Sequence, residues 1–465
     1  MSPITHMSRA VASFRPSAMP LLSRAHYRRE LWAWTMLPVA LAAVEGGVTG
    51  VIARNCFEGA VSDGLLNFAV AVLAGAPAIS NIVSFLWSAV AHGRDKIRTT
   101  NVLQVATLVM IALIALAPFN ALGLVMLVMG AVGARVCWSG VTILRSTVWR
   151  ANYPRSIRAT LAGKLATVQS LVLAGTASII GFAMDADENA IRIVYPAAAL
   201  VGGGGALIYR RLRMRGHRAL LNAERDNRSE GGASFNPIHV HRVLRRDPAF
   251  RQYMLWMFIF GFGNLATSAP LIIILREHFQ LRQMSSVLIT ATIPLLLMPV
   301  SIPIWSRLLD RTHIIHFRAT HSWTFVLSTL CITLGAVLGQ VWLLVIGAMI
   351  KGIAFGGGVL GWNLGHHDFA PPEQASQYMG VHVTLTGIRG VLAPLMAVGI
   401  YEWLEAWRPG TGGWTFAVCL MFSFIGALGF LRMARTTTIE RSDRVVESTL
   451  QQNRVATEDT LSPRG

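Results

Sequence analysis

Charged residues are scarce in this sequence. Only 14% of its 465 residues are Asp, Glu, Lys or Arg, whereas 53% are hydrophobic. A soluble globular protein carries about a quarter of its residues as charged types, so the shortage excludes a water-facing shell around a single core. Apolar runs long enough to cross a bilayer recur from residue 31 to residue 434. We therefore predict a polytopic membrane protein.

Cysteine is also rare, and the sequence lacks the motifs of metal and nucleotide sites. The four cysteines are far apart and mostly lie within apolar runs, at Cys56, Cys137, Cys331 and Cys419. No C-x-x-C spacing occurs, so we expect neither a disulfide framework nor a cysteine metal site. His366-His367-Asp368 has no third ligand four residues on, and there is no Walker motif. We expect no metal, no cofactor and no enzymatic activity.

Lysine is nearly absent, because Lys96, Lys164 and Lys351 are the only three in the chain. Arginine therefore carries most of the net charge of +18, which in a soluble protein would indicate nucleic-acid binding. Here the arginines gather in four segments, namely 1–30, 94–98, 150–158 and 210–251. Positive residues favour the cytoplasmic side of a membrane. We predict a protein of the plasma membrane (a bacterial inner membrane) with both termini in the cytoplasm and no nucleic-acid partner.

The hydropathy pattern predicts twelve spans. They lie approximately at 31–53, 65–90, 101–118, 121–144, 160–183, 190–209, 252–275, 284–307, 319–339, 342–365, 378–402 and 414–434. Only helices satisfy the backbone over such stretches in lipid, so the fold class is an all-α polytopic membrane protein. Five regions follow, namely a cytoplasmic segment 1–30, a six-helix half 31–209, a basic cytoplasmic linker 210–251, a second six-helix half 252–434, and a cytoplasmic tail 435–465 for which we expect disorder.

The two halves repeat each other in sequence. Residues 217 positions apart match as Gly130-Ala131 with Gly347-Ala348, and as Pro154 with Pro371. With six spans each, the halves have the same orientation and form parallel repeats. Such repeats place the substrate site near the middle of the membrane, between the halves.

Residues 30–435 resemble the major facilitator superfamily of transporters. In that family the loops after spans 2 and 8 carry a small residue, three others and Asp-Arg, and the second copy here reads Ser306 to Asp310-Arg311. The first copy has His92-Gly93 at the Asp-Arg position, with Arg94 next to it. The resemblance implies gating roles for Asp310, Arg311 and Arg94. It also implies that spans 1, 4, 7 and 10 line a central cavity.

Four charged residues lie deep within predicted spans, at Glu45, Arg135, Lys351 and Arg389. A charge at mid-depth costs about 2.5–3.5 kcal/mol, so it usually faces a cavity or a partner. Glu45 is the only acid deep in any span. It either carries a proton or substrate, or it is a structural ion-pair partner for an arginine.

Arg135 and Lys351 occupy almost equivalent positions of the two halves. Two cations that face one cavity would attract an anionic group, for which an arginine fork is suited; alternatively Glu45 neutralises Arg135. Arg389, between Gly387 and Gly390, is expected to gate, to pair with an acid, or to reach the interface. Asn264 and Asn363 are candidate ligand contacts, although asparagine also links helices.

We therefore predict secondary active transport of a small solute by alternating access. Proton coupling, an anionic substrate and a monomer in the bilayer are our expectations. One alternative is a membrane receptor or sensor that keeps a transporter fold without transport. A second is an integral-membrane enzyme, for which no nucleophile or His/Asp arrangement is found in the sequence.

Overall fold

The chain folds into a bundle of long helices. A computed structural model describes residues 12–226, 237–370 and 375–436, and these contain helices and no strand. Twelve of the helical segments are long and apolar enough to cross a membrane, which confirms the predicted fold class. They are Leu21–Cys56, Asp63–Val83, Lys96–Ile114, Ala121–Asn152, Thr160–Ala186, Glu188–Arg210, Pro248–Glu277, Gln283–Arg311, Ile314–Leu338, Val341–Leu364, Gln377–Trp407 and Gly412–Thr436.

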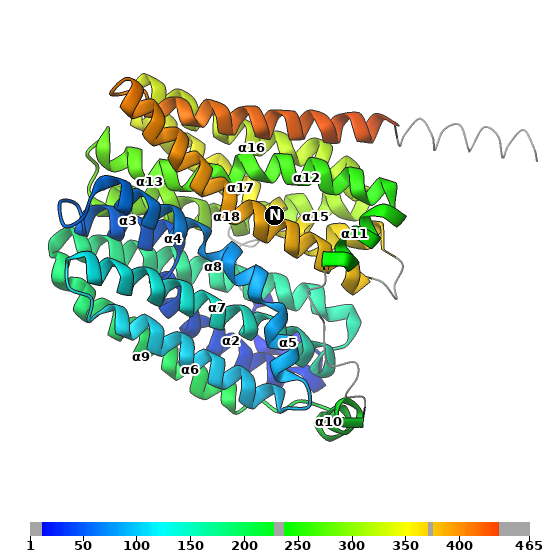
Figure 1. Ribbon diagram of the computed structural model, residues 1–465. Helices are drawn as coiled ribbons and strands as arrows, with labels where there is room; N and C mark the ends of the chain where they lie inside the picture. The colour runs from blue at the N-terminus through cyan, green and yellow to red at the C-terminus, as the bar shows by residue number, and fades with distance from the viewer. Residues whose placement is uncertain (1–11, 227–236, 371–374, 437–465) are drawn as a thin grey trace, which may run out of the picture.

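The first half is built from eight helices, which fill the lower part of Figure 1. They are α2 (Leu21–Ala42), α3 (Gly46–Cys56), α4 (Asp63–Val83), α5 (Phe85–Ala91), α6 (Lys96–Ile114), α7 (Ala121–Asn152), α8 (Arg155–Ala186) and α9 (Ile191–Arg210). Within this half, α2 packs against α8 and α9, and α6 packs against α7 and α9.

The second half lies above the first in Figure 1. Its elements include α12 (Pro248–Ala266), α13 (Ser268–Glu277), α14 (Gln283–Val287), the π-helix η4 (Leu288–Thr292), α15 (Ile293–Arg311), α16 (Ile314–Leu338), α17 (Val341–Leu364) and α18 (Ala375–Trp407). The halves meet mainly where α4 contacts α18 and where α8 contacts α14 and α15. A cavity between the halves is consequently bordered by helices from both.

Polar caps set where several spans begin. Asp95 accepts hydrogen bonds from the backbone of Ile97 (2.9 Å) and Arg98 (3.0 Å) at the start of α6. Asp247 caps α12 through the N–H of Phe250 at 2.8 Å. Such a cap contributes about 1 kcal/mol because it satisfies an N–H that has no partner within the helix.

The first span differs from the prediction in two ways. It begins at Leu21 rather than residue 31, since the arginine-bearing segment before the apolar run continues the same helix. It is also interrupted, because α2 ends at Ala42 and α3 begins at Gly46. Glu45 takes an extended backbone conformation at this interruption (φ −69°, ψ 133°). The apolar pattern runs on across the interruption and therefore gave no sign of it.

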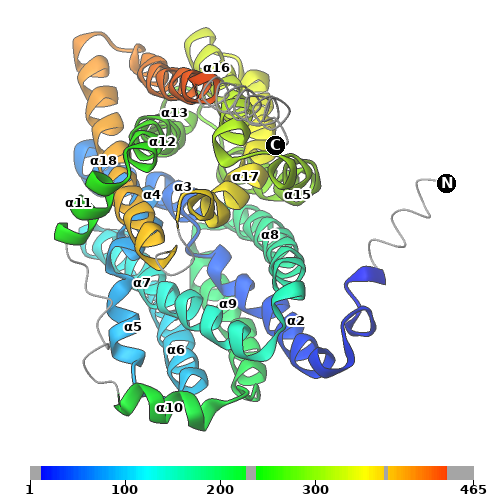
Figure 2. The ribbon, with the colours of Figure 1, turned by 90° about the vertical axis from the view of Figure 1, so that its right-hand side faces the viewer.

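The described parts of the basic linker include two helices. Its described residues include α10 (His217–Asp226) and α11 (Pro237–Arg246), and α10 lies beside the ends of α5, α6 and α9 in Figure 2. The physical reason is an ion pair between Glu224 of α10 and Lys96, with the two atoms 2.6 Å apart. The tail, for which we predicted disorder, lies outside the described residues from position 437 on.

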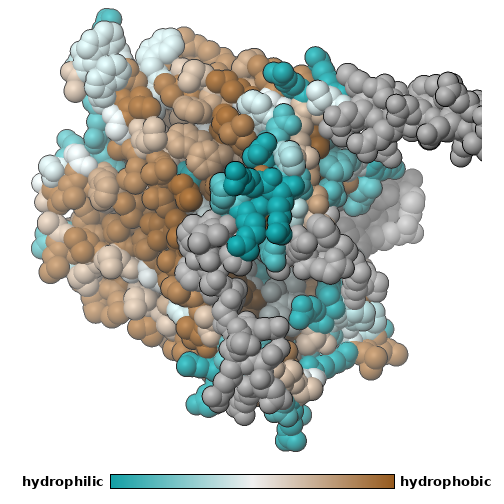
Figure 3. Space-filling model, turned by 45° about the vertical axis from the view of Figure 1, so that its right-hand side comes forward, coloured by the Kyte–Doolittle hydropathy of each residue, from teal (hydrophilic) through white to brown (hydrophobic). Residues whose placement is uncertain are grey.

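The outer surface of the bundle is apolar where lipid would surround it. Large hydrophobic side chains are exposed along α6 and α9, among them Val102, Val105, Leu200 and Leu207. Figure 3 shows a broad hydrophobic face beside a hydrophilic end where the linker lies. Exposed apolar area of this extent is typical of a membrane or partner contact.

Candidate functional site

A cavity of about 470 Å³ lies between the two halves. The first half contributes Glu45 to Gly47 at the interruption of its first span, together with residues of α4. The second half contributes residues of α12, α13, η4, α16, α17 and α18. The cavity extends to Asn363, one residue from the end of α17 on the linker side, where that side chain is exposed.

The interruption at Glu45 leaves backbone carbonyls without helical partners, and side chains bind them. Tyr195 of α9 donates its hydroxyl to the carbonyl of Ala43 at 2.8 Å. Arg135 of α7 donates from Nε to the carbonyl of Val44 at 2.9 Å. Unwound backbone within a membrane is tolerated where such partners or a cavity satisfy it. Interrupted helices of this kind form the binding sites of many transporters.

Arg135 also forms an ion pair with Glu45. The pair is only partly buried, since the Glu45 side chain is 28% exposed and that of Arg135 15%. Glu45 lines the cavity, whereas Arg135 is not among the lining residues. The structure thus joins the two residues that the sequence analysis singled out in the first half.

The second half repeats this arrangement with different chemistry. Its first span is interrupted at Thr267, between α12 and α13, and Lys351 of α17 donates to the Thr267 hydroxyl at 3.1 Å. In each half, then, a cation from the fourth span contacts the interruption of the first. Glu45 stands at the interruption in the first half, whereas a neutral threonine stands there in the second.

Two further arginines reach the cavity from the second half. Arg389 of α18 is only 4% exposed, and it donates to the carbonyl of Met257 and to Thr386 Oγ1, the latter at 3.2 Å. Arg318 of α16 is 1% exposed, and its Nε and one terminal nitrogen have no hydrogen-bond partner. No described acidic side chain lies within ion-pair distance of Arg318, Lys351 or Arg389. Arg389 therefore lies among the cavity residues rather than beside an acid.

Both candidate asparagines line the cavity. The amide oxygen of Asn264, on α12, accepts a hydrogen bond from the hydroxyl of Ser423 at 3.4 Å. Asn363 donates to the carbonyl of Val359 at 2.8 Å, within its own helix. Each has polar atoms left to contact a solute.

Polar contacts join the halves at the end of the bundle away from the linker. Arg54 of α3 pairs with Glu277 of α13 at 2.6 Å, and Arg276 pairs with Glu58 at 2.7 Å. Asn67 of α4 donates to Glu402 of α18 at 3.2 Å. We call these contacts the outer network. They hold the two halves together between the cavity and the end of the bundle away from the linker.

The gating residues that the loop motif predicts lie at the linker end and are exposed there, unlike Arg389 in the cavity. Asp310 and Arg311 end α15, Arg94 follows α5, and none of the three has an ion-pair partner among the described residues. The loop near Arg94 is instead held by α10. Glu224 accepts from Lys96 Nζ (2.6 Å) and from the Gly93 N–H (2.8 Å).

Sequence reasoning missed Arg318 and Glu224. Arg318 falls one residue before the predicted start of its span at 319, so the predicted spans did not include it. The helix α16 in fact begins at Ile314, which carries Arg318 into the bundle. Glu224 lies in a polar segment with many charges, and its contact with Lys96 bridges 128 residues. No local signal marks such a pair.

Comparison with known proteins identifies the family. The profile described as Major Facilitator Superfamily matches residues 30–394. The chain therefore belongs to this superfamily of membrane transporters, as the loop motif and the repeat indicated. No curated protein matches the chain.

Solved structures of transporters share the fold. A D-xylose-proton symporter aligns with a TM-score of 0.66 at 11% identity, covering 87% of this chain and 96% of that one. The nucleoside transporter NupG gives 0.59 at 13%, covering 87% and 98%. The human organic anion transporter MFSD10 gives 0.56 at 11%, covering 89% and 100%. At these identities the likeness establishes the fold alone.

Proposed function

We propose that this protein carries a small anionic solute across the membrane by alternating access, coupled to protons. One observation carries the proposal: the cavity between the halves has three basic side chains, Arg318, Lys351 and Arg389, without described acidic partners. Glu45 is the single acid among the described lining residues, and Arg135 already pairs with it. The charge of the cavity is consequently positive.

An anion would relieve a real electrostatic cost. A buried cation without a partner is strongly unfavourable, and pairing offsets that cost when hydrogen bonds accompany it. The free nitrogens of Arg318 are suited to the two oxygens of a carboxylate or phosphate group. Lys351 would add a point charge, and Asn264 a neutral polar contact for the remainder of the solute.

Glu45 and Arg135 provide a route for proton coupling. A solute that draws Arg135 toward itself would leave the Glu45 carboxylate without its cation, and the carboxylate would then take up a proton. The two binding events are linked, because each changes the affinity for the other by the same factor. The outer network closes the end away from the linker, which corresponds to one of the two states of an alternating-access cycle.

We place the linker side of the bundle in the cytoplasm of a bacterial cell, with the protein as a monomer. The support is the arginine excess in the linker and in the segment before α2. Introduced cysteines at Ala219 and Asn222 should resist a membrane-impermeant thiol reagent in intact cells and react in inverted vesicles. Reaction in intact cells would reverse this orientation.

Transport by purified protein in liposomes tests the proposal. A panel of carboxylates and phosphate esters, with neutral and cationic solutes as controls, should show pH-gradient-driven accumulation of anions alone. Exchange of internal for external solute would distinguish a transporter from a receptor. Recovery of the solute in chemically unchanged form would distinguish a transporter from an enzyme. Arg307→Gln, at an exposed site outside the cavity, is the matched control for Arg318→Gln. Binding without exchange in every case would refute the transport function.

A further inference from the structure

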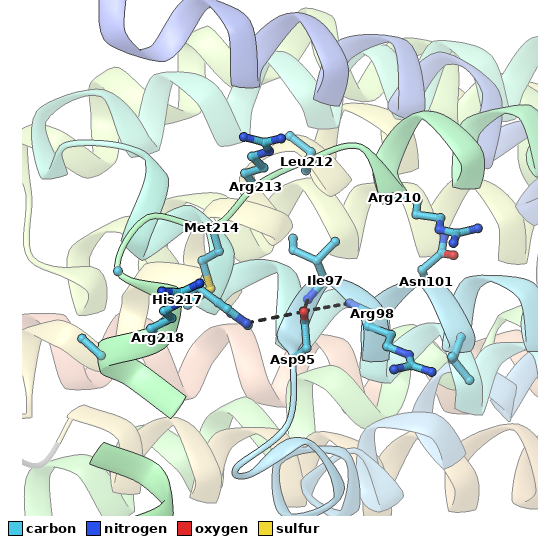
Figure 4. A pocket seen from close by; sticks show the side chains of 13 residues that line it. Asp95, Ile97, Arg98, Asn101, Arg210, Leu212, Arg213, Met214, His217 and Arg218 are labelled. Atoms are coloured by element: carbon cyan, nitrogen blue, oxygen red, sulfur yellow. Dashed lines mark hydrogen bonds and ion pairs between the residues drawn. The ribbon is translucent and has the colours of Figure 1, made fainter. Parts of the chain in front are cut away.

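A second, larger hollow lies outside the central cavity. It has a volume of about 1060 Å³ and lies at the linker-side ends of α6 and α9, where the chain turns into α10. Figure 4 shows the side chains that line it and the segments from which they come. We call it the interface pocket. The transport mechanism makes no use of it.

Four arginines line the interface pocket, at Arg98, Arg210, Arg213 and Arg218, and all four are exposed. Among the described residues none of them has a carboxylate partner. Asp95 is the acid in the lining, and its carboxylate is already engaged. It caps α6 and lies 3.5 Å from His217 Nε2, as the dashed lines of Figure 4 indicate. The pocket is therefore positively charged.

The interface pocket lies at the ends of two membrane spans. Arg98 stands in the first turn of a membrane span and Arg210 is the last residue of another. The two helices are tied together one turn deeper, where Asn101 donates to the carbonyl of Ala206 at 2.9 Å. Arginines at the ends of spans lie at the level of lipid headgroups.

An apolar path leads from the pocket toward the hydrocarbon. Val102 lines the pocket itself and is 60% exposed. Val105, Val109 and Leu207 continue along the outer faces of the same two helices, and all three are exposed. A water-soluble anion would contact only the arginines, whereas a lipid would use both surfaces.

We infer that the interface pocket binds the phosphate headgroup of an anionic phospholipid from the leaflet on the linker side. The arginines would bind the headgroup, and its acyl chains would lie along the exposed valines and leucine of α6 and α9. Basic pockets between membrane helices bind headgroups in this way. Because the linker provides Arg213 and Arg218, the lipid would also fix α10 against the first half.

Native mass spectrometry of the purified full-length protein tests the assignment. Phosphatidylglycerol should remain bound and phosphatidylcholine should not. The double variants Arg98→Gln/Arg210→Gln and Arg213→Gln/Arg218→Gln should each weaken phosphatidylglycerol binding about 25-fold, since each surface arginine contributes about fivefold. The control Arg245→Gln/Arg246→Gln removes two exposed arginines of α11 on the same side, outside the pocket, and should change binding less than twofold.

Three results would overturn the inference. Equal retention of phosphatidylglycerol by all variants, or an equal loss in the α11 control, would mean that general surface charge attracts the lipid. Stabilisation by inorganic phosphate alone, equal to that by phosphatidylglycerol, would assign the pocket to a soluble anion. Melting temperatures measured in phosphatidylcholine show whether each variant is folded. Because the two double variants change different arginines of the pocket, a folded form of either one is sufficient to test lipid binding. The assay measures binding, so its outcome does not depend on the proposed transport.

Discussion

At the scale of single residues, the two halves share a geometry and differ in charge. Arg135 and Lys351 each contact the interruption of the first span of their own half. In the first half Glu45 balances the cation. In the second half Thr267 is neutral, so Lys351 has no acidic partner at this position. Under the proposed mechanism, the same framework would separate a site for protons from a site for anions.

Substitution of the pair should separate coupling from binding. Glu45→Gln is expected to abolish accumulation driven by a pH gradient and to preserve solute exchange, because the amide cannot carry a proton. Arg135→Ala should impair both, since the carbonyl of Val44 and Glu45 lose their donor. Uptake and counterflow in liposomes measure the two activities.

Two outcomes would contradict this division. If Glu45→Gln still accumulates solute with unchanged pH dependence, the coupling group is elsewhere or transport is passive. If both single variants misfold and the double variant is restored, the pair has a structural role only.

The buried arginines should determine anion affinity. Removal of one charged hydrogen-bonding group costs about 1.5–3 kcal/mol, so Arg318→Gln and Arg389→Gln should each weaken anion binding at least tenfold. Thermal stabilisation by the transported anion gives the affinity. Arg318→Lys should also bind the anion weakly, since lysine lacks the two-pronged donor of arginine. Full affinity in Arg318→Gln would exclude this residue from the site.

At the scale of elements, α10 replaces a missing motif contact. The first loop copy has His92-Gly93 where Asp-Arg is expected. Glu224 reaches this loop from the linker, since its carboxylate contacts Gly93 and Lys96 and its backbone carbonyl contacts His92. Burial opposes ionisation of Glu224, but hydrogen bonds from Lys96 and the Gly93 N–H, with the charge of Lys96, lower its pKa from 4.5. The carboxylate is thus ionised when α10 is docked.

The docking of α10 should depend on pH in one direction. A carboxyl whose pKa is lowered by docking stabilises the docked state above pH 4.5, and this stabilisation is lost as pH falls through the lowered pKa. Glu224→Gln should undock α10 at neutral pH and remove the transition. The anisotropy of a dye at Asn222→Cys reports the motion. An acid transition that persists in Glu224→Gln would assign it to another group.

The sequence predicted the positions of the membrane spans better than the contacts between them. Hydropathy located all twelve spans, because lipid exposure imposes long apolar helices. The repeat predicts equivalent positions for Arg135 and Lys351, and in the structure they contact Val44 and Thr267, respectively. The interruption at Glu45, the burial of Arg318 and the Glu224–Lys96 pair depend on contacts between distant segments. Local patterns do not contain that information.

At the scale of the whole molecule, the outer network favours the conformation seen here. Arg54 is 3% exposed and pairs with Glu277 at 2.6 Å and, within its own half, with the exposed Asp63 at 3.4 Å. Loss of Glu277 would leave this nearly buried cation with only the more distant acid. Breaking such a pair is strongly unfavourable. Tyr401 also donates to Glu277 at 2.6 Å and adds to this contact between the halves.

Glu277→Gln should shift the protein toward the state that opens away from the linker. We expect the ratio of the two states to change at least tenfold, which corresponds to about 1.4 kcal/mol. Spin-label distances between the outer ends of α4 and α18 would lengthen. Asp310→Asn, at an exposed residue of the opposite end, should leave this outer distance distribution unchanged. Unaltered distances in Glu277→Gln would mean that apolar packing alone closes the outer end.

The near absence of lysine has a practical consequence for chemical probing. Lys96 is 4% exposed and ion-paired, Lys164 donates to the backbone of Ser13, and Lys351 faces the central cavity. An amine-selective reagent small enough to enter the cavity should therefore modify Lys351, and peptide mass spectrometry would register it without any introduced label. Solutes that occupy the cavity would slow this modification, so candidate compounds can be ranked by the protection they give to Lys351, measured separately from the partly buried Lys164.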